Sequence, residues 1–117
     1  MSKSSVLLSS IAALLISACA ASVHFTPAAD ARAPKSPDSK IQVFGKDDSV
    51  KVRHTVLGLI SIDDTGFTTD CAYDVVLAKA VQEARTVGAD AIKIVQHERP
   101  DLWSSCHRIK ALAIAFD

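Results

Sequence analysis

The sequence is sparing in the residues that mark several protein classes. Its 117 residues include only four glycines, four prolines and three cysteines, and aromatic residues make up 5% of the chain. So little glycine, proline and cysteine excludes a collagen-like chain and a dense disulfide scaffold. The 13 basic and 13 acidic side chains cancel, which argues against nucleic acid as a partner because nucleic-acid binders carry a basic excess. An apolar fraction of 49% excludes a disordered chain.

No apolar run reaches the roughly 20 residues that a membrane-spanning helix needs. The longest such run covers residues 6–16, follows the single charge of Lys3, and contains two serines. This arrangement is typical of a cleaved export signal, and we expect a signal peptide over residues 1–18. An uncleaved anchor is the less favoured alternative.

The signal ends in Ile16, Ser17, Ala18 and Cys19, a tetrapeptide that resembles the bacterial lipobox. The resemblance implies that Cys19 becomes the lipidated amino terminus, the covalent lipid being the only cofactor we expect. Ala20 in the next position favours the outer membrane of a bacterial cell envelope, facing the periplasm or the cell surface. An ordinary signal peptide with a chance cysteine is the alternative.

The next segment differs in composition from the rest of the chain. Residues 19–39 hold three of the four prolines (Pro27, Pro34 and Pro37) among alanines and isolated charges. We expect the lipidated cysteine to be followed here by a flexible tether, in which His24 and Phe25 are solvated and without a role. Residues 40–117 then form the only domain.

The domain alternates strand and helix patterns. We expect strands over residues 40–44, 50–62, 91–95 and 106–116. In the second of these, either both faces are covered near the centre or a bulge at Gly58 changes which side chains share a face. Between the second and third of these, apolar residues recur at helical spacing up to Val87, with Thr69 or Asp70 as the cap and Gly88 as the terminator. The last strand places large side chains on one face and alanines on the other, which indicates that the helix packs against one face and that another element closely approaches the second. The expected fold is α+β in the order ββαββ, one helix packed on a small, mostly antiparallel sheet.

Two stretches resemble a known family. Residues 56–61 (VLGLIS) and 84–92 (ARTVGADAI) are similar to the strand and helix exit of YbjQ-type domains. With the lipobox, the proline-bearing segment and the cysteines, the chain resembles the stress-sensor lipoproteins of the Rcs phosphorelay over about residues 53–117. The resemblance implies a disulfide between Cys71 and Cys106, but the second disulfide of those sensors has no counterpart here and their longer loop before the helix is shortened.

Cysteine number alone favours the same bridge. If Cys19 is lipidated, Cys71 and Cys106 are the two remaining thiols of a protein in an oxidising compartment. The alternative is a reactive thiol, because Cys71 is expected near the start of the helix, where the helix dipole lowers a thiol pKa. No Cys-x-x-Cys motif supports that oxidoreductase reading.

Four other residues are candidates for a role. His97 and His107 flank the turn before the last strand, and two imidazoles could hold a transition metal, although no full ligand set is evident and we expect no metal. Trp103, the only tryptophan, is a possible partner contact in the same turn. His54 lies on the apolar side of its strand and is expected to be a hydrogen-bonded core residue.

The function we expect is therefore non-enzymatic. A small, disulfide-stapled envelope lipoprotein would reach the membrane through its lipid and bind another envelope protein through an edge strand and the Trp103 turn, as an interaction or stress-sensing module. The alternative is a metal-binding envelope lipoprotein that uses His97 and His107.

Overall fold

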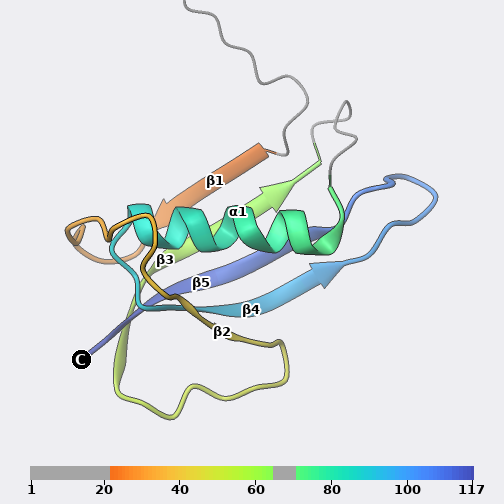
Figure 1. Cartoon of the computed structure of the whole chain (residues 1–117). Helices are drawn as coiled ribbons and strands as arrows, with labels where there is room; N and C mark the ends of the chain where they lie inside the picture. The colour runs from red at the N-terminus through yellow and green to blue at the C-terminus, as the bar shows by residue number, and fades with distance from the viewer. Residues whose placement is uncertain (1–21, 65–70) are drawn as a thin grey trace, which may run out of the picture.

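The elements of the chain form one sheet crossed by one helix (Figure 1). A computed structural model describes residues 22–64 and 71–117. The expected signal peptide, the expected lipidation site Cys19 and the expected caps Thr69 and Asp70 lie outside the described residues. In chain order the elements are β1 (Ser22–Pro27), β2 (Gln42–Phe44), β3 (His54–Asp63), α1 (Tyr73–Thr86), β4 (Ala91–Glu98) and β5 (Arg108–Phe116).

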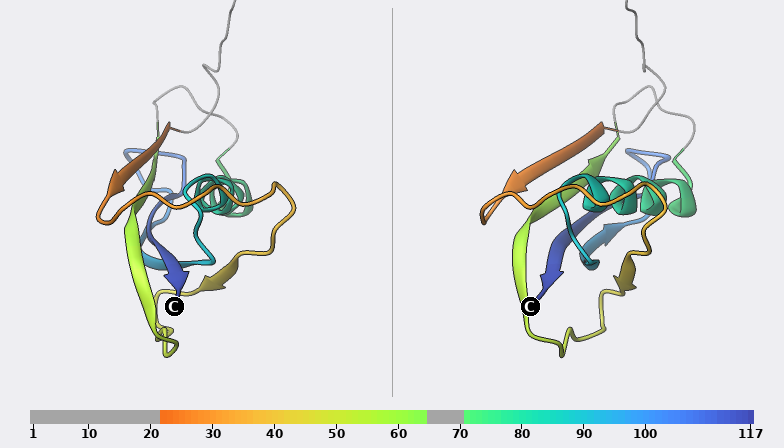
Figure 2. Two further views of the ribbon diagram at one scale, coloured as in Figure 1. Left: turned by 90° about the vertical axis from the view of Figure 1, so that its left-hand side faces the viewer. Right: turned by 60° about the vertical axis from the view of Figure 1, so that its left-hand side comes forward.

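The sheet has the strand order β1-β3-β5-β4-β2. The pairs β1/β3, β3/β5 and β5/β4 are antiparallel, while β2 runs parallel to β4 at one edge. The two views of Figure 2 show α1 lying across one face of this twisted sheet. The α+β class with a helix on a mostly antiparallel sheet is confirmed, but the order is βββαββ because one strand precedes those expected.

That additional strand corrects the prediction of a flexible tether. Ser22–Pro27 pairs in register with β3, Ser22 opposite Asp63 and Pro27 opposite Gly58. Phe25, expected to be solvated, is half-buried and packs against the core, whereas His24 is exposed and shares a hydrogen bond with Ser22. Burial of one aromatic ring and backbone pairing with β3 stabilise a segment whose composition predicts disorder.

A β-bulge near Gly58 is confirmed. The β3/β5 register shifts between Val56 and Gly58, so that Leu57 turns into the core at 3% exposure. A Cβ atom on Gly58 would lie 2.4 Å from the Thr26 carbonyl oxygen and 2.5 Å from a ring carbon of Phe25. Glycine is therefore required where β1 approaches β3.

The helix ends where expected but begins without a side-chain cap. Its N-cap is Ala72, in extended conformation and with no capping hydrogen bond from its side chain, so the expectation of Thr69 or Asp70 as the cap is wrong. Asp74 in the first turn and Arg85 in the last have the charges that favour the helix dipole. Gly88 follows with a φ of 81°, the left-handed conformation of a helix terminator.

Small residues lie at the centre of the core, where the helix packs against the sheet. Val76, Ala80 and Ala84 of α1 are fully buried in one cluster with Ala111 and Ala113 of β5. The alanine face of β5 is thus the face that the helix covers, and the close approach is that of the helix itself. Isoleucines of β3, β4 and β5 complete the cluster: Ile60, Ile62, Ile92, Ile94 and Ile109.

Residues 28–39 run along the C-terminal end of the helix instead of leaving the domain. The Lys35 backbone N–H donates to the carbonyl of Arg85 at 2.8 Å, and the Arg85 side chain donates to the carbonyl of Ser39 at 2.8 Å. Beyond the helix, Asp90 accepts hydrogen bonds from the side chain of Lys35 at 2.5 Å and from the backbone N–H of Phe116 at 2.8 Å. The folded unit therefore includes β1 and residues 28–39, and it does not begin at residue 40.

Candidate functional site: the bridged end

The Cys71–Cys106 disulfide joins the residue before the helix cap to the segment preceding β5. The two residues are 35 apart in sequence, with their Cα atoms at 5.1 Å. Both are buried, at 6% and 1% exposure, and the His107 backbone N–H donates to the Cys71 carbonyl at 3.2 Å. The bridge fixes the start of α1 to the β4–β5 loop, residues 99–107. We call this part of the molecule, Cys71 with residues 99–107, the bridged end.

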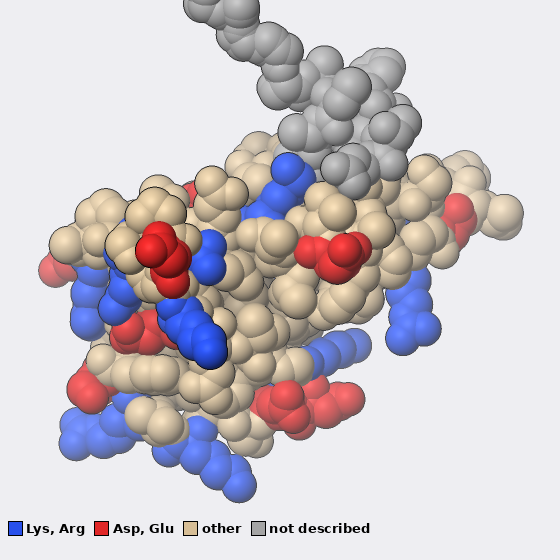
Figure 3. All heavy atoms as spheres, in the orientation of Figure 1, with Lys and Arg blue, Asp and Glu red and all other residues tan. Residues whose placement is uncertain are grey.

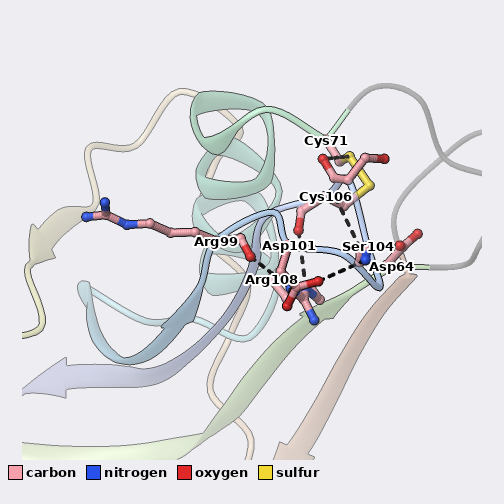
Figure 4. Close-up of a disulfide and its surroundings, with 8 residues drawn as sticks. Asp64, Cys71, Arg99, Asp101, Ser104, Cys106 and Arg108 are labelled. Atoms are coloured by element: carbon pink, nitrogen blue, oxygen red, sulfur yellow. Dashed lines mark hydrogen bonds and ion pairs between the residues drawn. A yellow bond between two sulfur atoms is a disulfide. The ribbon is translucent and has the colours of Figure 1, made fainter.

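The β4–β5 loop is held in one shape by hydrogen bonds of its own (Figure 4). The Asp101 carboxylate accepts from the backbone N–H groups of Trp103 and Ser104, both at 2.9 Å. These two hydrogen bonds lower the pKa of Asp101 below its usual value, and the bond from Trp103 has the larger effect. Arg108 closes the loop from the other side by donating to the Asp101 carboxylate at 3.3 Å and to the Arg99 carbonyl at 3.0 Å. The loop is therefore ordered by local polar contacts.

This ordered loop presents two apolar side chains to solvent. Leu102 is 98% exposed and Trp103 is 92% exposed. The adjacent Ser104 hydroxyl hydrogen-bonds the carboxylate of Asp64 just beyond β3, and it accepts from the Cys106 backbone N–H at 3.1 Å. We call Leu102 and Trp103 the apolar tip. Exposed large apolar side chains are a feature that contact surfaces share.

His97 and His107, which flank the turn in the sequence, face each other in the structure. The Nε2 atom of His97 and the Nδ1 atom of His107 are 2.9 Å apart, so one nitrogen carries the proton and the other accepts it. Tyr73, in the first turn of α1, stacks on His97 with ring centroids 4.6 Å apart, and its ring is tilted against His107 at 5.7 Å. The three rings join the starts of α1 and β5 to the end of β4.

Electrostatics favour the neutral form of His97. Its pKa is lowered first by burial and then by the positive charges of His107, Arg99 and Lys46. A neutral imidazole is the form that binds metals. Among residues 22–64 and 71–117, however, no group of three or more histidine, cysteine, aspartate or glutamate side chains could hold a metal ion. The two histidines thus offer two nitrogen ligands, to which the bridged Cys106 adds none.

His54 does not occupy the core position expected for it. It lies half-buried at the start of β3 and donates from Nδ1 to the Val52 carbonyl at 2.6 Å. The register shift near Gly58 explains the difference, because residues before a bulge no longer share the face of those after it.

Sequence reasoning missed the residues that shape the loop. Asp101 followed by Ser104 is a pattern typical of a side chain that caps its own turn, and it could have been recognised. Arg108 and Tyr73 carry no such local signal, because their partners are brought near by the pairing of β4 with β5 and by the packing of α1.

Two further findings bear on function. Over the described part of the chain, no helix combines the length and the apolar character needed to cross a membrane. Comparisons with protein-family models, with curated proteins and with solved structures return no match to this chain.

Proposed function

We propose that the chain is a non-enzymatic envelope lipoprotein whose small domain is an interaction or stress-sensing module. The observation that carries the proposal is the Cys71–Cys106 disulfide. Disulfides persist in oxidising compartments outside the cytosol, and a domain of this size gains much of its stability from one. The lipobox-like tetrapeptide ending at Cys19 supplies the membrane anchor.

A binding role is favoured over redox catalysis by the state of Cys71. Its sulfur is bonded to that of Cys106, and both residues are buried. A catalytic thiol needs to be accessible and to have a low pKa, so this pair suits a structural bridge. The apolar tip (Leu102 and Trp103), by contrast, is open to contact.

For the protein partner we propose the edges of the sheet. Strands β1 and β2 terminate the strand order, and within residues 22–64 and 71–117 each has a neighbouring strand on one side only. Val23 on β1 and Val43 on β2 are 38% and 40% exposed. An extended segment of another envelope protein could add to either edge by backbone hydrogen bonds.

The test is non-reducing peptide mapping of the exported protein, with mass analysis of its amino-terminal peptide. The expected result is an acylated Cys19 as the first residue and a peptide containing Cys71 linked to Cys106. A mature chain that begins elsewhere would overturn the lipid anchor, and free thiols at residues 71 and 106 would overturn the stapled binding module.

One observation favours metal binding as a second candidate function. The nitrogens of His97 and His107 that face each other are 2.9 Å apart, close to the ~3.3 Å that separates two nitrogen ligands of one tetrahedral zinc ion. These two residues would hold a transition ion after giving up their mutual hydrogen bond. Water or a partner would complete the coordination.

Calorimetric titration of the exported protein with Zn²⁺, Cu²⁺ and Ni²⁺ distinguishes the two functions. The metal function requires near-stoichiometric binding that His97→Ala and His107→Ala each abolish while His54→Ala does not. Absence of binding to the wild-type protein at micromolar metal would remove this candidate and leave the first untouched.

A further inference from the structure

The start of β1 limits how far the domain can lie from a lipid on Cys19. Ser22, the first residue of β1, pairs with Asp63 at the end of β3. Three peptide steps separate Cys19 from Ser22, and these span at most about 11 Å whatever path they take. If Cys19 is lipidated, as in the function proposed above, Ser22 is held within about that distance of the membrane surface.

The apolar tip (Leu102 and Trp103) lies at the same end of the sheet as Ser22. Ser22 pairs with Asp63, the next residue along, Asp64, is hydrogen-bonded to Ser104, and Trp103 precedes Ser104 in the β4–β5 loop. In Figure 1 the start of β1, the end of β3 and this loop share one end of the molecule. An anchor at Cys19 therefore holds the tip close to the bilayer.

The tip has the chemistry of a membrane-interface contact. Tryptophan is enriched at the headgroup level, where its apolar ring is buried and its indole N–H stays hydrated. The Asp101 and Arg108 contacts hold the loop in shape before any contact is made, so little conformational entropy is lost on insertion.

Charge does not provide the attraction at this end. The acidic residues Asp63, Asp64, Glu98 and Asp101 outnumber the basic residues Arg99, Arg108 and Lys110, and Arg108 already pairs with two of the carboxylates. Figure 3 shows acidic and basic groups interspersed over the visible face, and the outermost atoms at the β4–β5 loop are tan. Contact with a bilayer here would depend on burial of apolar surface and not on anionic headgroups.

We propose that Leu102 and Trp103 insert into the headgroup region of the bilayer that carries the Cys19 lipid, and so fix the orientation of the domain on the membrane. The inference rests on the proposed lipid anchor. It assigns the apolar tip to a phospholipid surface and leaves the β2 edge, which pairs with the start of β4 and so lies away from the tip, for a protein partner.

Fluorescence of the full exported protein tests the proposal, because Trp103 is the only tryptophan. The protein is extracted from membranes and reconstituted into vesicles of phosphatidylethanolamine and phosphatidylglycerol. We expect the Trp103 emission to shift to shorter wavelength relative to that of the detergent-free Cys19→Ser protein. Lipids brominated on their acyl chains should quench this emission, and aqueous acrylamide should no longer quench it. Raising the salt concentration should change none of these.

Two matched variants sharpen the test. Leu102→Asp places a charge in the apolar tip and should restore acrylamide quenching of Trp103. Val52→Asp makes the same kind of change at a residue that is 51% exposed before the start of β3, at the other end of that strand from the tip, and should leave the quenching unchanged. Both sites are exposed, so both variants should keep the Cys71–Cys106 bridge.

The outcomes separate this inference from the function on which it rests. If the protein is lipidated but acrylamide still quenches Trp103 on vesicles, the membrane contact alone is overturned. The apolar tip would then be assigned to a pocket of a partner protein. A mass spectrum without a lipid on Cys19 overturns the anchor and the membrane contact together.

Discussion

The two ends of the helix are held in different ways. At its start, the bridged end (Cys71 with residues 99–107) combines a disulfide with hydrogen bonds inside one loop. At its end, residues 28–39 lie against residues 85–90 through backbone contacts and the Lys35–Asp90 ion pair. We call this second region, residues 28–39 with Gly88 to Asp90, the wrapped end.

The difference shows at which end of the helix a covalent bond restrains the chain. The bridged end exposes Leu102 and Trp103 almost completely, so burial of apolar side chains does not hold its loop in place. The disulfide and the polar contacts of the loop hold it instead. The wrapped end is ordered by the fold around it, since every contact named above joins residues far apart in the chain. The exposed tip thus lies on a loop whose shape depends on the disulfide and on hydrogen bonds within the loop.

Removing the bridge should have the largest effect. The double variant Cys71→Ala/Cys106→Ala frees the 35-residue separation that the disulfide closes, which costs about 4 kcal/mol of unfolding free energy in the chain-entropy model. Urea unfolding of the variant and of reduced wild-type protein should agree. A loss below about 1 kcal/mol would show that the bridge adds little to this end.

At the wrapped end the most sensitive residue is Gly88. Gly88→Ala places a side chain at a φ of 81°, and its Cβ would lie 2.5 Å from the Ala33 carbonyl oxygen. We expect a loss of about 2 kcal/mol in thermal or urea unfolding. Asparagine tolerates the left-handed conformation better than alanine does. Gly88→Asn should therefore recover the part of the loss that comes from backbone strain, but not the part that comes from the clash of the Cβ atom. An alanine variant as stable as the wild type would contradict the wrapped arrangement.

The carboxylate of Asp90 should contribute less. Burial raises its pKa, but the Lys35 hydrogen bond, the Phe116 backbone N–H and nearby positive charges together lower it below 3.8. Its contribution is therefore complete above that value and is lost as the pH falls through the lower folded-state pKa.

Asp90→Asn should cost about 1 kcal/mol at neutral pH, and its difference from the wild type should shrink on acidification below about pH 4. Asp38→Asn, at an exposed carboxyl in the same wrapped end, serves as the control. A difference between Asp90→Asn and the wild type that does not change with pH would show that the charge of Asp90 is not what matters.

The smallest expected effect lies in the histidine pair. Because the pKa of His97 is lowered from 6.5, the unfolded chain takes up the proton first as the pH falls. Stability is therefore full above about 6.5 and declines below it by some tenths of a kcal/mol. Urea midpoints at about pH 7.5 and about pH 5.5 should differ for the wild type and differ less for His97→Gln. His24→Gln, at an exposed site, should behave as the wild type does.

Local pattern predicted most of the elements but not their boundaries. The helix over Tyr73–Thr86, its termination at Gly88 and the bulge at Gly58 depend on spacing and on glycine, and these signals are contained within a few residues. Strand β4 extends to Glu98, beyond the expected residue 95. Its extension follows from pairing with β5 across a second register shift, between Ile94 and Gln96.

The candidate site was predictable in part for the same reason. His97, His107 and the Cys71–Cys106 pair could be named because few residues of those types exist in the chain. Tyr73 and Arg108, which complete the two clusters, are ordinary residues in sequence terms. Only the packing of α1 and the register of β4 with β5 bring them to the site.

The amino-acid sequence alone was sufficient for the α+β class, the position of the helix and the pairing of the two cysteines, because periodicity, glycine and residue type act locally or by count. The tertiary structure decided that Ser22–Pro27 is a strand, that the alanines of β5 face the helix, and that Ser22 lies at the same end of the sheet as Trp103. Each of these depends on which strands become neighbours, and that choice is made by burial summed over the whole core.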